Sequence, residues 1–411
     1  MVVLTRARRP LRTRPPSRAR SALGLLLAGA AALAATEPLT AQGALLPGDP
    51  LPGLTPAEHE EFLLGREDFL EVETAGEGLG PAYNGTSCAA CHIVPAIGGI
   101  APMTTTRVGV LDAAGAFHEV EPAFGTLFQS FSIPPHECQT IIPAEAGVIA
   151  TRIPIPLFGA GLVEAIPDAA LEALADPLDL DRDGISGRAP LVPDRSTGVL
   201  RVGRFGWKSQ QGSLMDFGAE AYRNELGITN DLFPRELTFR LSPRQLARCD
   251  AVPDPEDIVD PATGRRGIDN LAAFLRLLAP PARGPITPAA QRGRQVFDAI
   301  GCTACHAPAL ATGPSSHPVF DRRTVPLFSD LLLHDVGTGD GIRQAGAEPE
   351  EIRTPALWGL RFRRPLLHDG SAATVVEAIG RHGGEAAPAR AGFDRLPDGD
   401  RDALLAFLGS L

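Results

Sequence analysis

Two short motifs combine a pair of cysteines with a histidine at the spacing used for covalent haem attachment. They are Cys88-Ala-Ala-Cys91-His92 and Cys302-Thr-Ala-Cys305-His306. In a C-x-x-C-H motif the two thiols face one side of a helical turn and form thioethers to the haem vinyl groups, while the next residue offers its imidazole to the iron. A zinc site would need a second ligand pair near each motif, and the sequence has none. The motifs therefore predict two c-type haems, with His92 and His306 as iron ligands.

Two further cysteines, Cys138 and Cys249, lie outside both motifs. In an oxidising compartment they most simply pair with each other. Such a bridge would close a long loop and restrict the unfolded chain by about 4–5 kcal/mol in the chain-entropy model. A redox-active thiol pair is the alternative, but no basic cluster lies near either cysteine to support it. We predict a structural disulfide.

The first 41 residues have the three parts of a secretory signal peptide. Seven arginines precede the continuous apolar run Ala22–Ala35, and small residues suited to cleavage follow near Ala34 and Ala41. The run is too short to span a bilayer as a helix, so an uncleaved membrane anchor is the less favoured alternative. We predict export to the periplasm.

The formal net charge of the chain is −11, and removal of its arginine-rich start would make it more acidic. Such a chain is a poor ligand for nucleic acid or anionic lipid. We expect no nucleic-acid partner, and membrane contact only if the signal stays uncleaved. An acidic surface suits a small basic redox protein as electron donor, although another donor is equally compatible with the sequence.

Helical patterns surround the motifs. They cover Thr55–Phe69, Pro167–Ala175, Leu214–Leu226, Ile268–Leu278 and Asp400–Leu408. Residues 98–205 are punctuated by Gly and Pro and favour a few short strands. The stretch Ala279–Ile286 indicates a linker, after which a helix with Gly293 and Phe297 precedes the second motif. We predict a mainly α protein of two cytochrome c-like haem domains with loop-rich insertions, at 42–283 and 284–411.

Several longer stretches resemble the di-haem oxidoreductase family, whose members are also described as peroxidases or thiol oxidoreductases. These stretches are Phe158-Gly-Ala-Gly-Leu-Val-Glu-Ala-Ile-Pro-Asp168, Asp183-Gly-Ile-Ser-Gly-Arg188, Arg204-Phe-Gly-Trp-Lys208, Asp330-Leu-Leu-Leu-His-Asp335, Leu366-Leu-His-Asp-Gly370 and His382-Gly-Gly-Glu-Ala386. The family is in turn similar to the bacterial di-haem cytochrome c peroxidases, the di-haem enzyme that matures methylamine dehydrogenase, and the rubber oxygenases. The resemblance implies an oxidoreductase enzyme.

The resemblance implies a second ligand for the C-terminal haem. The segment from Arg353 to Gly370 is similar to the stretch that precedes the axial Met of the peroxidases, and at the matching spacing this chain has His382. The C-terminal iron would then be held by His306 and His382. Two imidazoles stabilise ferric iron more than His with Met, so a lower reduction potential is expected. An ordinary helix-capping histidine is the alternative for His382.

Two catalytic assignments also follow from the resemblance alone. The peroxidases place a Trp between their haems, in a stretch similar to Phe205-Gly-Trp207, which implies Trp207 as an electron relay; a core tryptophan is the alternative. Their glutamate above the peroxide-binding iron lies in a segment similar to the one containing Glu225, two residues out of register. Glu225 would move a proton during O–O cleavage, since a desolvated carboxyl has a raised pKa. A surface glutamate is the alternative.

The N-terminal haem departs from the peroxidases, which carry a removable distal histidine shortly after the first motif. This sequence has no histidine there, and the nearest candidates, at other spacings, are Met103, His118 and His136. The departure implies an iron that is open to peroxide or dioxygen.

The segment Asp179-Leu-Asp181-Arg-Asp183-Gly184 has the alternating carboxylates of a calcium loop. The twelfth position, which should be Glu, is Pro190, so the EF-hand motif is incomplete. A calcium site and a solvated turn both remain open.

Together these features predict an exported di-haem c-type cytochrome that acts as a peroxidase-like oxidoreductase. The C-terminal haem would take an electron from a small donor and pass it through Trp207 to an open N-terminal haem that reduces peroxide. Two alternatives remain. One is a non-catalytic electron-transfer cytochrome with both irons six-coordinate, and the other is a haem oxygenase that acts on an organic substrate.

Overall fold

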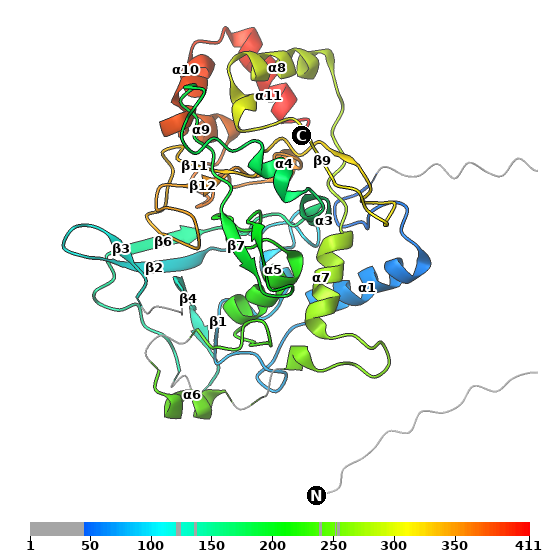
Figure 1. Cartoon of the computed structure of the whole chain (residues 1–411), viewed down its shortest axis with the longest axis vertical. Coiled ribbons are helices and arrows are strands. Elements are labelled where there is room, and N and C mark those ends of the chain that lie inside the picture. Colours follow the sequence, from blue (N-terminus) through cyan, green and yellow to red (C-terminus); the bar gives the residue numbers. More distant parts are fainter. Residues whose placement is uncertain (1–44, 121–124, 135–137, 238–240, 251, 253–254) are drawn as a thin grey trace, which may run out of the picture. The chain divides into compact units, whose positions relative to one another are not determined.

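A pair of crossing helices forms the C-terminal part of the chain in the computed structural model (Figure 1). Helix α8 (Pro288–Ala299) packs against the last helix, α11 (Asp398–Leu408). A Cβ atom on Gly293 would lie 1.9 Å from the carbonyl oxygen of Ala403, so only glycine permits this close approach. The apolar faces of both helices, with Phe297 and Phe407 between them, form a hydrophobic core beside the second motif.

The structure describes residues 45–120, 125–134, 138–237, 241–250, 252 and 255–411. The predicted signal segment, residues 1–41, and His136 lie outside the described residues. No helix in the described part of the chain is long and apolar enough to cross a membrane. Helices predominate over short strands, in agreement with the expected mainly α class.

A second helix pair stands beside the first motif. Helix α1 (Pro56–Leu70) begins at a capping box in which Thr55 accepts a hydrogen bond from the backbone of Glu58. It crosses α7 (Gly267–Leu277), and a Cβ atom on Gly65 would lie 2.0 Å from the carbonyl oxygen of Asn270. Both motifs therefore follow a helix that a glycine brings close to a partner (Figure 1).

Short helices occupy the segments between these pairs. They are α2 (Cys88–Cys91), α3 (Ala160–Glu164), α4 (Asp168–Glu172), α5 (Leu214–Ala221), α6 (Pro243–Cys249), α9 (Val375–Gly380) and α10 (Ala387–Asp394), with single turns at η2 (Pro255–Asp257), η3 (Cys302–Ala304), η4 (Leu360–Phe362) and η5 (Gly384–Ala386). The helix expected over 214–226 is α-helical only to Ala221 and continues as the π-helix η1 (Tyr222–Leu226). π-Helical turns are rare and occur often at functional sites.

All strand pairs in the described residues are antiparallel. Strand β2 (Thr105–Leu111) pairs with β3 (Phe117–His118), β4 (Leu127–Phe128) and β6 (Val148–Arg152). The remaining pairs are β1 (Ala82–Tyr83) with β5 (Phe131–Ser132), β7 (Leu191–Asp194) with β8 (Val199–Val202), β9 (Leu310–Ala311) with β10 (Thr324–Val325), and β11 (Leu333–His334) with β12 (Ile352–Arg353). Because Arg152 lies opposite Thr105, Arg107 and Arg152 project from the same face of the sheet.

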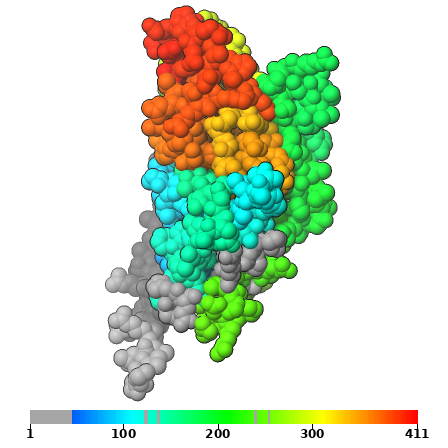
Figure 2. Space-filling model, turned by 90° about the vertical axis from the view of Figure 1, so that its left-hand side faces the viewer, coloured from blue at the N-terminus to red at the C-terminus, as the bar shows by residue number. Residues whose placement is uncertain are grey.

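Residues far apart in sequence join across this sheet. Arg152 on β6 donates to Asp340 at 2.7 Å, and orange surface from the later segment lies against cyan surface from β2 and its neighbours (Figure 2). Phe320 and Leu331, which follow the second motif, pack into the hydrophobic core around α1 and α7. The division at 283/284 and the cytochrome c-like character of the two halves stay predictions.

The predicted disulfide is confirmed. Cys138 and Cys249 are bonded, with Cα atoms 6.3 Å apart and a sequence separation of 111. The bond connects the loop after β5 to the end of α6.

Replacement of both Cys138 and Cys249 by Ser should lower the free energy of unfolding by about 4–5 kcal/mol, because the unfolded chain regains the entropy of a long closed loop. Denaturant unfolding of the two proteins, each prepared under oxidising conditions, measures the difference. A loss below about 1 kcal/mol would show that the bond does not constrain the unfolded chain.

Candidate functional site

The first motif lines a cavity of about 160 Å³. Cys88, Cys91 and His92 lie on its wall, and so do the two residues assigned from the resemblance, Trp207 and Glu225. The first motif forms the short helix α2, capped by Ser87, whose hydroxyl accepts from the backbone of Ala90. The structure thus brings together every predicted site residue of the N-terminal half.

The imidazole of His92 is oriented by one hydrogen bond. Its Nδ1 lies 2.9 Å from the carbonyl oxygen of Gly99, and a carbonyl can only accept, so Nδ1 carries the proton. Burial lowers the pKa of His92 to about 4, which keeps the ring neutral. Phe69 of α1 packs 6.3 Å away, ring to ring. A neutral imidazole with Nδ1–H held by a carbonyl presents Nε2 to a metal.

Glu225 faces the same cavity from the π-helix η1. Its Oε2 accepts a hydrogen bond from Asn84 Nδ2 at 3.0 Å. Its backbone carbonyl accepts from the amides of Asn84 and Gly85, just before the first motif. Burial raises the pKa of Glu225, and the neighbouring Arg107 opposes that rise. The carboxyl of Glu225 is therefore partly desolvated in the pocket wall and oriented by its hydrogen bond from Asn84. This environment differs from that of the surface glutamate considered as the alternative.

The other candidate ligands for the first iron lie elsewhere. Met103 is exposed, and His118 is exposed and paired with Asp112 at 3.0 Å. Neither lines the N-terminal pocket. Among the described residues of its wall, His92 is the single imidazole.

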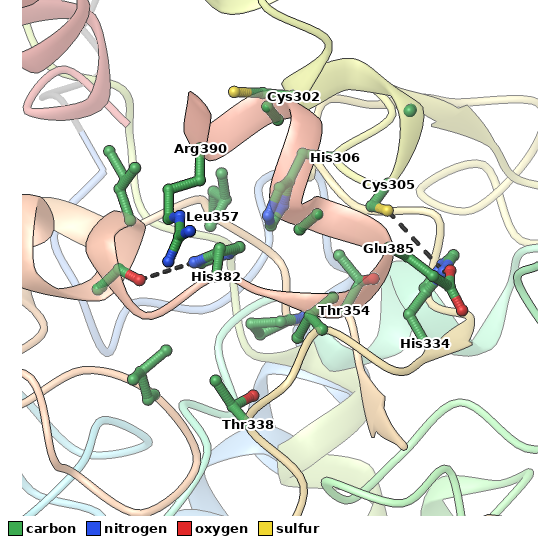
Figure 3. A pocket seen from close by; sticks show the side chains of 18 of the residues that line it. Cys302, Cys305, His306, His334, Thr338, Thr354, Leu357, His382, Glu385 and Arg390 are labelled. Atoms are coloured by element: carbon green, nitrogen blue, oxygen red, sulfur yellow. Dashed lines mark hydrogen bonds and ion pairs between the residues drawn. The ribbon is translucent and has the colours of Figure 1, made fainter. Parts of the chain in front are cut away.

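The second motif lines a larger cavity, of about 420 Å³ (Figure 3). Cys302, Cys305, His306 and His382 lie around it, and its apolar wall includes Phe297 of α8. His306 Nδ1 lies 3.0 Å from the carbonyl oxygen of Phe328. His382 Nδ1 lies 2.7 Å from that of Ala378, on α9. Both rings therefore also present Nε2.

Electrostatics keeps these pocket groups uncharged. Burial lowers the pKa of His306 to about 4, with a further contribution from His382, whose own pKa burial also lowers. Burial raises the thiol pKa of Cys88 and Cys302 to about 12 and that of Cys91 to about 11. Zinc binding needs thiolates, whereas these are buried thiols in largely apolar walls. The donor set and the cavities fit two haems better than a zinc site.

Trp207 forms part of the wall of both cavities. Its ring is buried, and Nε1 donates to the carbonyl oxygen of Ile153 at 2.8 Å. The ring of His368 packs against it edge-on, 6.2 Å away. Backbone contacts hold the same segment, because the amide of Arg353 donates to the carbonyl oxygen of Trp207 at 2.8 Å. Trp207 is thus a fixed aromatic group between the two predicted haem positions.

Two buried ionic clusters were not anticipated. His334 lies between Asp330 at 2.9 Å and Glu385 at 2.7 Å, with Cys305 Sγ 3.9 Å away. Burial alone would lower the pKa of His334, but the hydrogen bonds outweigh it and raise the pKa to about 12. The ring is therefore an imidazolium. Asp330 lies only four residues before His334, whereas Glu385 comes from a distant segment, so local sequence carries no signal for the complete cluster.

The second cluster joins the only lysine of the chain, Lys208, to Asp340 at 3.1 Å, and the same carboxylate binds Arg152. Lys208 also donates to the carbonyl oxygens of Glu348 and Pro349. All three charged side chains are buried. The cluster fixes the segment that contains Trp207.

The Asp-rich turn brings three carboxylates together. Oxygens of Asp179, Asp181 and Asp183 lie within 4.8 Å of one another. Backbone amides, including those of Gly184 and Ile185, also donate to these carboxylates. An Asp-rich turn makes such hydrogen bonds without an ion, so the geometry fits both interpretations of the segment.

Replacement of His334 by Gln removes the cation between two carboxylates. We expect the free energy of unfolding near neutral pH to fall by about 3–5 kcal/mol. The folded-state pKa is raised above 6.5, so the wild-type contribution is complete below pH 6.5 and is lost as pH rises toward about 12.

Denaturant unfolding at a series of pH values in this range measures the free energy of unfolding. This free energy should fall less steeply with rising pH in His334→Gln than in wild type. The exposed pair of His118 and Asp112 provides the control, since His118→Gln should change stability little. Equally steep profiles in wild type and His334→Gln would contradict a charged His334.

Three solved structures are similar to the chain at low sequence identity. No curated protein sequence matches the chain. Among solved structures, the hydrazine synthase of Kuenenia stuttgartiensis is similar at 16% identity and a TM-score of 0.40, over 95% of this chain and 99% of that chain. The di-haem peroxidase BthA of Burkholderia thailandensis is similar at 15% identity and a TM-score of 0.39, over 86% of each chain. A MauG-like protein associated with microbial copper homeostasis is similar at 19% identity and a TM-score of 0.31, over 63% of this chain and 90% of that chain.

The family model described as "Di-haem oxidoreductase, putative peroxidase" matches residues 103–411. The match contains the second motif, Trp207, Glu225 and His382, while the first motif precedes it. Because the matched region is most of the chain, the protein belongs to the di-haem oxidoreductase family.

Proposed function

We propose that the mature chain is a periplasmic c-type di-haem peroxidase that reduces peroxide with electrons from a small redox protein. The observation that carries this proposal is the position of Trp207 and Glu225. Trp207 lines both pockets, whereas Glu225 lines only the pocket of His92. One pocket thus combines a single imidazole with a proton-carrying group. The other combines the shared tryptophan with His306 and His382, the two imidazoles whose Nδ1 is held by a backbone carbonyl.

The family implies haem in both pockets, and the two motifs would attach it through their cysteines. When bound, haem supplies an iron that exchanges electrons and, where an axial position is open, coordinates peroxide. His92 would provide one ligand through Nε2, and His306 with His382 would provide two. The N-terminal pocket has one imidazole that presents Nε2 and the C-terminal pocket has His306 and His382, which supports an open N-terminal site and a closed C-terminal one.

Glu225 is suited to move protons in the N-terminal pocket. Reduction of hydrogen peroxide to two waters consumes two electrons and two protons. Asn84 occupies Oε2, so Oε1 is the oxygen available to hold a proton. The raised pKa of the carboxyl increases its protonated fraction, and the proton can pass to the oxygen that leaves when the O–O bond breaks.

Trp207 is suited to carry the electron between the pockets. Its indole is rigid, because Nε1 is bound to the Ile153 carbonyl and the flanking backbone is bound to Arg353. A fixed aromatic ring needs no rearrangement to serve in each turnover. The acidic surface would favour a basic electron donor through charge complementarity.

Calcium is the remaining cofactor suggested by the sequence. The carboxylates of Asp179, Asp181 and Asp183 would supply oxygen ligands, the chemistry that calcium prefers. Calorimetric titration of chelator-treated protein with calcium distinguishes a bound ion from a solvated turn.

Replacement of Trp207 by Phe should slow electron transfer between the pockets by about tenfold or more, a barrier increase of about 1.4 kcal/mol. Stopped-flow oxidation of the reduced protein by peroxide measures the rate. The control is Trp358→Phe, since Trp358 is the only other tryptophan and lines neither pocket. An unchanged rate in Trp207→Phe would remove Trp207 from the pathway.

Replacement of Glu225 by Gln keeps the size of the side chain and an acceptor for Asn84 but removes the proton carrier. Peroxide turnover should fall by about 10²–10⁴-fold, while the absorption spectra of both ferric haems stay unchanged. Glu220→Gln is the control, because Glu220 lines the same pocket from α5. A greater loss in Glu220→Gln than in Glu225→Gln would assign the proton transfer to Glu220.

A further inference from the structure

Two arginines of the C-terminal pocket are buried without a carboxylate partner. Arg353 is 5% exposed and Arg363 is 6% exposed, and both line the cavity of the second motif. Arg353 donates only to carbonyl oxygens, of Gly206 at 2.8 Å and Thr354 at 3.2 Å. Arg363 donates to the carbonyl of Ala356 at 3.2 Å, and its Nε has no partner among the described residues.

Burial of a guanidinium without a counterion is unfavourable. Burial lowers the pKa of Arg363 to about 10, and no charged group opposes this shift. Burial also lowers the pKa of Arg353 to about 10, and repulsion from Arg363 adds to the effect. Asp330 acts on Arg353 in the opposite direction, but its carboxylate already accepts from His334.

Two other buried arginines of the chain have a carboxylate partner. Arg204 is paired with Asp168, and Arg152 is paired with Asp340 at 2.7 Å. Within the described residues, no ion pair joins Arg353 or Arg363 to an acidic side chain. Some buried guanidinium groups are therefore paired with a carboxylate of the chain. Arg353 and Arg363, in the pocket that contains His306 and His382, are not.

The missing anions match the group expected in this cavity. Haem carries two propionate carboxylates, and two guanidinium groups line the wall. His368 Nδ1, which is buried in the same wall, is another polar atom without a partner among the described residues. Guanidinium is the side-chain group best suited to bind a carboxylate with two parallel hydrogen bonds.

We infer that Arg353 and Arg363 bind the propionates of the haem attached at Cys302 and Cys305, an inference that rests on the proposed haem binding in this pocket. Two consequences follow. The cations keep the propionates ionised near neutral pH, and they disfavour the more positive ferric iron. They thereby raise a reduction potential that two imidazole ligands would otherwise make low.

The test measures the reduction potential of the C-terminal haem by spectroelectrochemistry in Arg353→Gln and Arg363→Gln. In each variant the Fe(III)/Fe(II) equilibrium should shift at least about tenfold toward Fe(III), which is 59 mV for one electron. The potential should also become pH-dependent near neutrality, as a released propionate titrates there. Arg363→Lys keeps the charge and should stay close to wild type.

The exposed neighbour Arg364 provides the matched control, since Arg364→Gln removes the same charge outside the cavity. An Arg364→Gln shift as large as that of Arg363→Gln, or an Arg363→Lys shift equal to that of Arg363→Gln, would overturn the inference. If Arg363→Gln does not fold, Arg353→Gln takes its place in both comparisons. An Arg364→Gln shift or an Arg363→Lys shift as large as that of Arg353→Gln would then overturn the inference.

Mass spectrometry of the wild-type protein separates this inference from the proposed function. A chain without covalent haem at Cys302 and Cys305 would overturn both. A chain with two haems, whose C-terminal potential is the same in the Gln variants and in wild type, would overturn the propionate assignment alone.

Discussion

Three hydrogen bonds between an imidazole Nδ1 and a backbone carbonyl underlie the site. They hold His92, His306 and His382 as neutral rings with Nε2 available to the pockets. Each bond depends on the local backbone, because the acceptor carbonyls belong to the loop after the first motif, the loop after the second motif, and α9. The crossed helix pairs α1–α7 and α8–α11 approach closely at glycines and place an aromatic ring against His92 and His306.

The wall between the pockets depends on buried charge. Lys208 and Arg152 share Asp340, while Arg353 binds the backbone around Trp207. Removal of Asp340 would leave two buried cations without their shared carboxylate in a low-dielectric region, so the wall resists local opening. A rigid wall suits a tryptophan whose position relative to both pockets must stay constant.

Local patterns in the sequence predicted the elements that depend on local interactions. The capping box at Thr55, the glycine crossing at Gly293 and the disulfide were all predictable in this sense. The pocket positions of Trp207 and Glu225 were suggested only by resemblance to a family. The complete cluster around His334 could not be predicted, because Glu385 reaches it only in the fold. The burial of Arg363 without a carboxylate also depends on tertiary packing that local sequence does not show. The π-helical turn at Glu225 likewise depends on packing against residues 84 and 85 rather than on propensity.

The proposed peroxidase requires one open haem and one closed haem. Low-temperature electron paramagnetic resonance of the ferric holoprotein, before and after addition of hydrogen peroxide, tests this requirement most directly. We expect one high-spin and one low-spin signal, with the high-spin signal lost on addition of peroxide. Two low-spin signals that do not respond to peroxide would contradict an open N-terminal haem. They would indicate an electron carrier in which a sixth ligand closes the first iron.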